Sequence, residues 1–259
     1  MTRATWCAAA VLALPALAAC SASRPAPAPV AECADLAQQP ARTAVCGRDE
    51  RVRSVQARFR AEVDAGGTRR TAEGVLVWRA PGALRVKLFT LAGLTVYDAV
   101  WVGDAGRLRG AVRQPLSGRD ESFALGPSDV PDSPDADLSL VLWSLWQPRC
   151  TRSPELVANA TYVLDASPAR ATGRSVRIAG GAIREETLVR ARRDGTIERV
   201  VARYADYDCG ATPLPRRVEI EAPASGWSAR VTILEQALDV TLDDALFVVP
   251  DARKSHAGG

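Results

Sequence analysis

Residues 74–101 read GVLVWRAPGALRVKLFTLAGLTVYDAVW, and this stretch decides the fold class. It contains three runs of alternating apolar residues, the first of which begins at Val75. Alternation with a period of two is typical of β-strands that bury one face. The pairs Pro81-Gly82 and Ala92-Gly93 separate the runs as turns, and a proline inside a helix would break it. The stretch therefore predicts an antiparallel meander of three strands.

The same alternation predicts which side chains share a face, because adjacent residues of a strand point to opposite sides of the sheet. Val75 and Val77 are expected to face the core, together with the alternating leucines that follow. Trp78 and Trp101 alternate oppositely to the valines beside them, which places them on the other face. Either face is a candidate lining for a cavity.

Outward from the meander, the chain continues to read as β-structure. Short alternating runs are separated by turn residues, such as GDAG at 103–106 and Asp194-Gly195, and these are hairpin signals. The further strands are expected over residues 107–112, 119–125, 161–164, 175–178, 183–192, 196–204, 217–221 and 227–234. We therefore expect a mainly β (α+β) fold.

An amphipathic helix is expected before the meander, over residues 49–63. Four apolar residues recur there at three-and-four spacing, namely Val52, Val55, Phe59 and Val63. This spacing places them on one face of a helix. The second half of the segment has an alternative interpretation as a strand, because Phe59, Ala61 and Val63 also alternate.

A second helix is expected from Leu138 to Trp146, after the polar loop 126–137. The acidic residues Asp135 and Asp137 suit a helix N-terminus, and Pro148 ends the segment. A helix that is apolar on every side is buried, inserted in a membrane or placed over a ligand cavity, and this one is too short to span a bilayer. The candidate ligand-cavity and lid residues are Leu138, Leu140, Leu142, Trp143, Leu145 and Trp146. Core packing is the alternative for each of them.

The N-terminus has the pattern of an export signal with a lipid attachment site. Arg3, a short apolar run and small residues before Cys20 are typical of a secretory signal peptide. The run Leu17-Ala-Ala-Cys20 matches the bacterial lipobox, in which Cys20 is acylated and becomes the mature N-terminus. An ordinary signal peptide cut near Ala19 is the alternative. Ser21, after the cysteine, points to the outer membrane, and several acyl chains on Cys20 would give stable anchoring.

This pattern sets the expected domain organisation. Residues 1–19 are the signal peptide, and residues 20–48 are the lipidated N-terminus with a Pro/Ala-rich tether, a composition that favours a semi-extended chain. Residues 49–250 form one domain, and residues 251–259 are a polar tail.

Four cysteines remain outside the signal peptide and the lipid site: Cys33, Cys46, Cys150 and Cys209. An even number of cysteines in an oxidising compartment predicts disulfides, and four cysteines allow three pairings. Proximity in sequence favours Cys33–Cys46 and Cys150–Cys209. A zinc site is the alternative, but the chain has no CxxC pair and its only histidine is His256. We therefore expect no metal site.

Two stretches resemble a known family. The run from Gly74 to Gly106 and the closing ALFVVP from Ala245 to Pro250 are similar to the LolA/LolB family of periplasmic lipoprotein carriers and receptors. The resemblance covers roughly residues 49–250. It implies a large antiparallel sheet curled into an unclosed barrel, with helices covering the opening and an apolar cavity that holds acyl chains.

The resemblance also implies roles for two sites. LolB-like members are outer-membrane lipoproteins that accept lipoproteins from a soluble periplasmic carrier, helped by a leucine on a protruding loop. The matching loop here is residues 90–94, with Leu91 and Leu94 as candidates, and Ala92 competes with Leu91 for the position. Arg85 matches by strand position the cavity arginine of some soluble carriers.

No catalytic chemistry is expected. A histidine in the tail, His256, cannot serve a buried catalytic triad, and the chain has no GxSxG, phosphate-loop or metal motif. No catalytic residue and no cofactor is therefore expected. The adjacent carboxylates Glu185-Glu186 would point to opposite faces of a strand, and we interpret both this pair and Asp243-Asp244 as solvated surface. A net charge of +3 gives no basic excess for nucleic acid.

Two hypotheses of different classes remain. In the first, the chain is an outer-membrane-anchored, periplasm-facing lipoprotein that binds acyl chains of lipids or lipoproteins, with a periplasmic carrier protein as a further partner. In the second, it is a structural or adaptor envelope lipoprotein with the same fold, whose core is filled and whose surface binds a protein.

Overall fold

The computed structural model describes residues 51–104, 107–115, 118–123, 138–139, 141–142, 161–167, 172–179, 181–192, 194–208 and 214–249. Twelve strands of this part form one sheet, in which every neighbouring pair is antiparallel. The strands are β1 (Ser54–Ala65), β2 (Thr68–Arg79), β3 (Ala83–Phe89), β4 (Thr95–Asp104), β5 (Arg107–Gln114), β6 (Arg119–Phe123), β7 (Thr161–Ser167), β8 (Thr172–Ala179), β9 (Ala182–Ala191), β10 (Ile197–Tyr207), β11 (Pro215–Ala222) and β12 (Trp227–Leu238).

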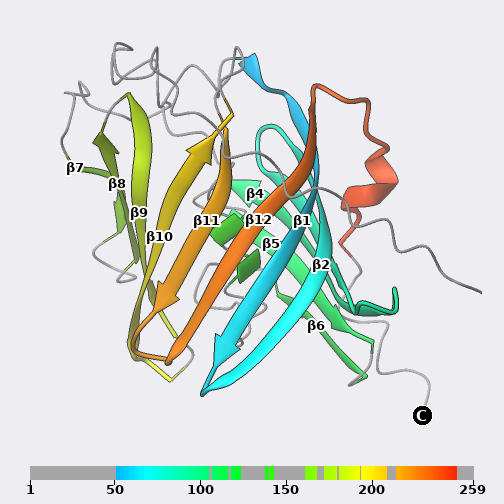
Figure 1. Ribbon diagram of the computed structural model, residues 1–259, viewed down its shortest axis with the longest axis horizontal. Coiled ribbons are helices and arrows are strands. Elements are labelled where there is room, and N and C mark those ends of the chain that lie inside the picture. Colours follow the sequence, from blue (N-terminus) through cyan, green and yellow to red (C-terminus); the bar gives the residue numbers. More distant parts are fainter. Residues whose placement is uncertain are drawn as a thin grey trace, which may run out of the picture.

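The strand order shows how the sheet is assembled. It runs β6-β5-β4-β3-β2-β1-β12-β11-β10-β9-β8-β7, so two six-stranded meanders meet where β1 pairs with β12. The two edges of the sheet are β6 and β7, which are consecutive in the chain. Figure 1 shows the sheet strongly curled, with these edges apart. The predicted antiparallel sheet in an unclosed barrel is confirmed.

Strand direction gives the sheet two distinct ends. The chain enters β1 and leaves β12 at one end, which we call the terminal end. The turns that join β1 to β2, β3 to β4, β9 to β10 and β11 to β12 lie at the opposite end of the strands, which we call the hairpin end. Figure 1 shows the β1–β2, β9–β10 and β11–β12 turns at the bottom. At the terminal end, entry and exit are tied together, because the Arg53 amide donates to the Asp239 side chain at 2.7 Å and the Asp239 amide donates to the Ser54 carbonyl at 2.9 Å.

The main hydrophobic core lies on the concave face of the curled sheet. Its largest fully buried side chains include Phe59, Leu76, Leu84, Tyr97 and Trp101. Strands β8 to β12 contribute further apolar residues to the same cluster. Burial of this apolar surface is the dominant favourable contribution to folding.

The segment expected to cover the opening is described at four residues, Leu138, Ser139, Val141 and Leu142. All four have helical backbone conformation and at most 1% exposure, and the three apolar ones belong to the main core. They belong to the chain between β6 and β7, so the segment that joins the two edges of the sheet sends apolar residues into its interior. The predicted helices over the opening are not supported as complete elements by the described residues.

The predicted helix over residues 49–63 is wrong for most of its length. Strand β1 begins at Ser54 and alternates buried and exposed residues, with Val55, Ala57 and Phe59 on the core face. It pairs with β2 on one side and with β12 on the other. The alternative strand interpretation of its second half is confirmed, and the two flanking ladders extend it toward the N-terminus.

The faces expected for the first strand of the meander are reversed: the tryptophan points to the main core, and the two valines point outward. Trp78 and Trp101 lie in the main core, at 3% and 0% exposure. Val75 and Val77 instead belong to a smaller cluster on the outer face, completed by Phe247. Phe247 ends a short 3-10 helix, η4 (Asp244–Phe247), formed by the closing segment of the chain.

Several expectations fall outside the described residues. These include the signal peptide, Cys20 and the tether, the four cysteines Cys33, Cys46, Cys150 and Cys209, and the tail from residue 251. Within the described ranges, no helix is both long enough and apolar enough to cross a membrane.

Candidate functional site

The concave face and the segment that enters it form the first part of the candidate site. Leu84, Val86 and Leu88 alternate along β3 toward this face, and Tyr97 and Trp101 face it from β4. The hydroxyls of Tyr97 and Ser139 form a hydrogen bond at 2.7 Å, and both residues are fully buried. This bond fastens the connecting segment to the interior of the sheet.

The structure places only some of the candidate lid residues. Leu138 and Leu142 are fully buried against the concave face. Leu140, Trp143, Leu145 and Trp146 lie outside the described residues. The described part therefore brings two of the six candidates to the sheet interior, and their role as ligand contacts remains a prediction.

The loop between β3 and β4, residues 90–94, is the second part of the site. The amide of Thr90 donates to the Leu94 carbonyl at 2.9 Å, and the amide of Gly93 donates to the Thr90 carbonyl at 2.9 Å. Gly93 has a φ of +81°, a conformation that favours glycine. This tight closure leaves the side chains of Leu91 and Leu94 exposed by 77% and 58%.

These two leucines are unusual in the described part of the chain, where only Ile197 and Val248 are also large, apolar and exposed. Leu91 and Leu94 lie within four residues of one another, at the hairpin end of the sheet. Exposed leucines that lie together on a loop are candidates for contact with a membrane or a partner.

Arg85 does not lie in the interior, contrary to its expected match with a cavity arginine. It projects to the outer face, donates to both carboxylate oxygens of Asp98 at 2.9 and 2.7 Å, and reaches the Leu246 carbonyl at 3.3 Å. Its hydrogen bond to Asp98 raises the pKa of Arg85 above the ordinary value. Arg79 assists by stacking over Phe247 and pairing with Asp244. The two arginines therefore hold η4 against the outer face.

Sequence analysis missed two buried carboxylates on the concave face. Glu186 and Glu198 are each 1% exposed. The interpretation of Glu186 as solvated is wrong, because its carboxylate lies inside and accepts a hydrogen bond from the Tyr204 hydroxyl at 3.1 Å. Glu185 points to the outer face, as expected from alternation, and pairs there with Arg203 at 3.4 Å. The sequence held one signal for the burial of Glu198, which alternates along its strand in step with the apolar residues Val200 and Ala202.

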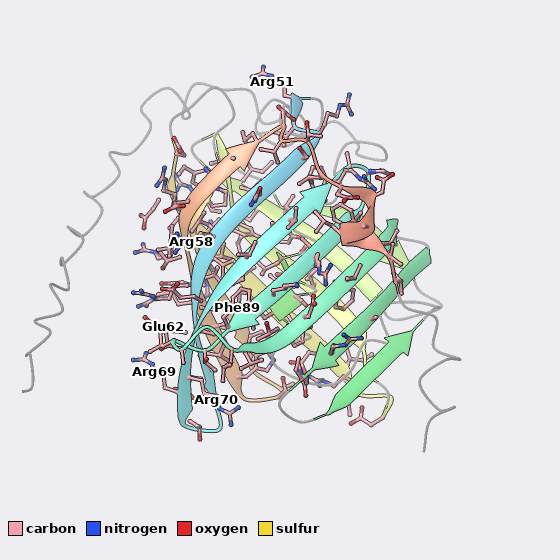
Figure 2. The ribbon with its side chains drawn as sticks, turned by 90° about the vertical axis from the view of Figure 1, so that its right-hand side faces the viewer. Arg51, Arg58, Glu62, Arg69, Arg70 and Phe89 are labelled. Carbon is pink, nitrogen blue, oxygen red and sulfur yellow. The ribbon has the colours of Figure 1, made fainter. Side chains whose placement is uncertain are left out.

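The outer face is polar. Cross-strand ion pairs cover it, including Arg203–Glu221 at 2.8 Å, Arg58–Glu235 at 3.2 Å and Arg230–Glu219 at 3.3 Å. Figure 2 shows Arg58 projecting outward from β1. Exposed pairs of this kind contribute at most about 1 kcal/mol each, so their main effect is to keep this face in water.

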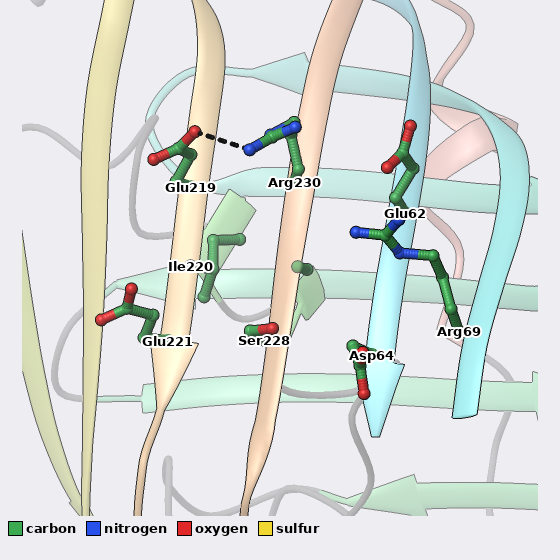
Figure 3. Close-up of a pocket in the computed structure, with 9 residues that line it drawn as sticks. Glu62, Asp64, Arg69, Glu219, Ile220, Glu221, Ser228 and Arg230 are labelled. Carbon is green, nitrogen blue, oxygen red and sulfur yellow. Dashed lines mark ion pairs between the residues drawn. The ribbon is translucent and has the colours of Figure 1, made fainter. Parts of the chain in front are cut away.

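A depression of about 150 Å³ lies on this outer face, over the ends of β1, β2, β11 and β12. Charged residues dominate its lining, among them Glu62, Asp64, Arg69, Glu219 and Glu221 (Figure 3). A lining of this composition does not suit an acyl chain, because burial of charged groups without partners is costly. Within the described ranges, no group of three metal-binding side chains comes together.

No protein-family model matches the sequence, and no curated protein is significantly similar to it. Solved structures share its fold. A LolA superfamily protein from Nitrosomonas europaea has a TM-score of 0.52 at 14% identity, over 81% of this chain and 98% of that chain. A DUF1329 family protein from Desulfovibrio piger has a TM-score of 0.50 at 10% identity, over 85% and 97% of the two chains. The chain therefore has a LolA-like fold, and the resemblance stated from the sequence is confirmed at the level of the fold.

Proposed function

We propose that this chain is a lipid-anchored envelope protein that holds acyl chains of lipids or lipoproteins between the concave face of its sheet and the segment 138–146. The supporting observation is the way the interior is covered. The two edge strands are joined by a segment that packs Leu138, Val141 and Leu142 against the apolar face.

The anchoring part of the proposal comes from the sequence. Residues 1–19 would be removed, Cys20 would carry the acyl chains, and residues 20–48 would tether the domain to the outer membrane. The LolA superfamily structure with the same fold supports a carrier type of function. A non-catalytic role in lipoprotein localisation, with a periplasmic carrier as donor, fits both.

The loop with Leu91 and Leu94 would be the point of contact with the bilayer. Burial of a leucine side chain contributes roughly 1.5–3 kcal/mol, so two leucines alone would bind a membrane weakly. A lipid anchor on the same chain would raise the local concentration of the loop at the membrane. Weak and reversible contact suits a protein that has to deliver a ligand and then withdraw.

The adaptor function is the second candidate, and one observation favours it. The described core residues of the covering segment, among them Leu138 and Leu142, have no exposed surface. A core that is filled in this way needs no ligand. In that case, the surface of the anchored domain would bind a protein partner.

Co-purified lipid distinguishes the two functions. The mature chain with Cys20→Ser carries no lipid of its own, so mass spectrometry of an organic extract reports bound ligand alone. We expect acyl-containing molecules in near-stoichiometric amounts, measured above the background of an unrelated envelope protein purified in parallel. An extract at background level would favour the adaptor function.

Substitution of the lid tryptophans gives an independent comparison. If they contact ligand, Trp143→Ala and Trp146→Ala should weaken binding of a fluorescent hydrophobic probe while the melting temperature changes little. In a filled core, the same substitutions should cost roughly 3–5 kcal/mol of stability.

A further inference from the structure

The concave face is not uniformly apolar, because the carboxylates of Glu186 and Glu198 are both buried on it. Glu198, the second residue of β10, is 1% exposed. Its side chain points to the same face as Val200 and Ala202, because these residues alternate along the strand and the last two belong to the main core. A carboxylate therefore lies at the hairpin end of the interior, next to the buried residues Val200 and Ala202 of β10.

The two oxygens of this carboxylate have different surroundings. Oε2 accepts a hydrogen bond from Nε of Arg192 at 2.6 Å. Oε1 is buried and has no hydrogen-bond partner. A buried acceptor without a partner is unfavourable, more so when it is charged. The carboxylate of Glu186 differs, since Tyr204 donates to it.

The turn before Glu198 is rigidly built, so this oxygen is held in place. The Arg192 amide donates to the Thr196 carbonyl at 2.8 Å, and the Gly195 amide donates to the Arg192 carbonyl at 3.0 Å. The Asp194 side chain accepts from both the amide and the hydroxyl of Thr196, which lowers the pKa of Asp194. Arg192 and Glu198 therefore lie on the two sides of a turn whose described residues hydrogen-bond to one another.

We propose that Oε1 of Glu198 accepts a hydrogen bond from the head group of the amphiphile that lies on the concave face, an inference that rests on the proposed acyl-binding function. The ligand class is an alkyl or acyl chain with an N–H or O–H donor at its head, such as an ammonium, a hydroxyl or an amide. Anionic head groups without a donor are selected against, because they offer no N–H or O–H to Oε1, while the Arg192 guanidinium is already engaged at Oε2.

The position of Glu198 agrees with the direction of loading. The β9–β10 turn and the loop with Leu91 and Leu94 lie at the same end of the sheet. A ligand that enters there from a bilayer would place its chain along Val200 and Ala202 and leave its head at Glu198. The head then lies at the same end of the strands as the leucine loop, with four strands between β3 and β10.

The test compares ligands with the same chain and different heads. Dodecylamine, dodecanol and dodecyl sulfate are titrated against the mature chain with Cys20→Ser, and binding is followed by displacement of the apolar dye N-phenyl-1-naphthylamine. We expect the amine and the alcohol to bind about tenfold tighter than the sulfate, the factor expected for one hydrogen bond to a charged group. Preference for the amine over the alcohol would indicate a cationic head, and equal binding of the two would indicate a neutral donor.

The decisive variant is Glu198→Gln, which retains the shape and presents an N–H donor at the same place. It should abolish or reverse the preference for donor heads. The ratio of two affinities within one variant does not depend on the folded fraction, so a loss of stability cannot imitate the result. Glu185→Gln, on the outer face of the neighbouring strand, is the matched control and should leave the ratio unchanged.

Two outcomes would overturn the inference, and they are distinguishable. If the dye binds and all three ligands displace it equally in the wild type and in Glu198→Gln, the head-group site is excluded while acyl binding stands. If the wild type binds neither dye nor ligand, the proposed function fails, and this inference fails with it.

Discussion

The hydroxyl of Tyr97 lies 2.7 Å from the hydroxyl of Ser139, and neither residue has exposed surface. Tyr97 belongs to the sheet, whereas Ser139 belongs to the segment between the two sheet edges. This bond therefore links a covering segment to the face that it covers. A buried hydrogen bond of this kind contributes roughly 0.5–1.5 kcal/mol, in addition to the burial of Leu138 and Leu142 beside it.

The first prediction concerns this bond. Tyr97→Phe removes the hydroxyl and keeps the ring, so we expect a loss of about 1 kcal/mol in the free energy of unfolding by urea. If the segment is a movable cover, the variant should also release a bound fluorescent fatty alcohol several times faster. Unchanged release, with only the stability loss, would indicate that the segment is a fixed part of the core. Tyr204→Phe, which removes a buried hydroxyl elsewhere on the same face, is the control.

The second prediction concerns the pairing of Phe59 with Gly74 across β1 and β2. The Phe59 ring lies directly over Gly74, where an added Cβ would be 2.6 and 2.7 Å from the ring carbons Cε2 and Cε1. Gly74→Ala should therefore overpack the core and destabilise the domain by roughly 1–3 kcal/mol. Gly67→Ala offers a contrast, because nothing lies within 4 Å there and only its φ of +78° is strained. The double variant Phe59→Leu/Gly74→Ala should recover part of the loss in chemical denaturation, and its failure to do so would contradict the overpacking explanation.

The third prediction concerns the attachment of the C-terminal segment. Arg85 and Asp98 are largely buried, with side-chain exposures of 23% and 15%, and Arg85 also reaches the Leu246 carbonyl. Asp98→Asn should cost about 1–3 kcal/mol, because it leaves a partly buried guanidinium without its charged partner. Proteolysis at the segment 240–249 should accelerate at the same time. Equal proteolysis of variant and wild type would show that Arg85 does not hold this segment.

The strands of the meander were easier to predict from the sequence than the faces to which their side chains point. The meander of residues 74–101 was predictable because its alternating runs are separated by turn residues of known geometry. The assignment of faces was not, because Val75 and Val77 look like core residues until the closing segment is known to cover them. Gly74 held a usable signal, since a residue without a side chain in a strand leaves room for a ring on the neighbouring strand.

The first strand shows a different limit. Val52, Val55, Phe59 and Val63 fit a helical period, while Phe59, Ala61 and Val63 fit a period of two. Both patterns are present, and the decision comes from pairing with β2 and β12, the second of which lies more than 160 residues away in sequence. Likewise, the burial of Glu186 depends on a tyrosine 18 residues further along, which no local pattern reveals.

The fourth prediction concerns the anchor. If Leu17-Ala-Ala-Cys20 is a lipobox, cells labelled with a clickable fatty acid should mark the wild-type protein, and Cys20→Ser should remain unlabelled. Cys33→Ser is the control for nonspecific thiol labelling and should remain fully marked. Labelling of Cys20→Ser at the wild-type level would exclude this cysteine as the attachment site.

The last prediction concerns the leucine loop. Leu91 and Leu94 are exposed by 77% and 58%, so Leu91→Glu and Leu94→Glu should change the folding free energy by no more than about 0.5 kcal/mol. If the loop contacts the bilayer, a charge there should slow delivery of a fluorescent fatty alcohol from the anchored protein to phospholipid vesicles several-fold. To supply the anchor, an N-terminal histidine tag holds each variant on vesicles that contain a nickel-chelating lipid.

Val248→Glu is the matched control for this prediction, because Val248 is an equally exposed apolar residue, at 65%, on the closing segment outside the loop. Equal delivery rates for Leu91→Glu, Val248→Glu and the wild type would exclude the loop as the contact. A slow rate for the loop variants alone would support the membrane role, because folding and anchoring are the same in all four proteins.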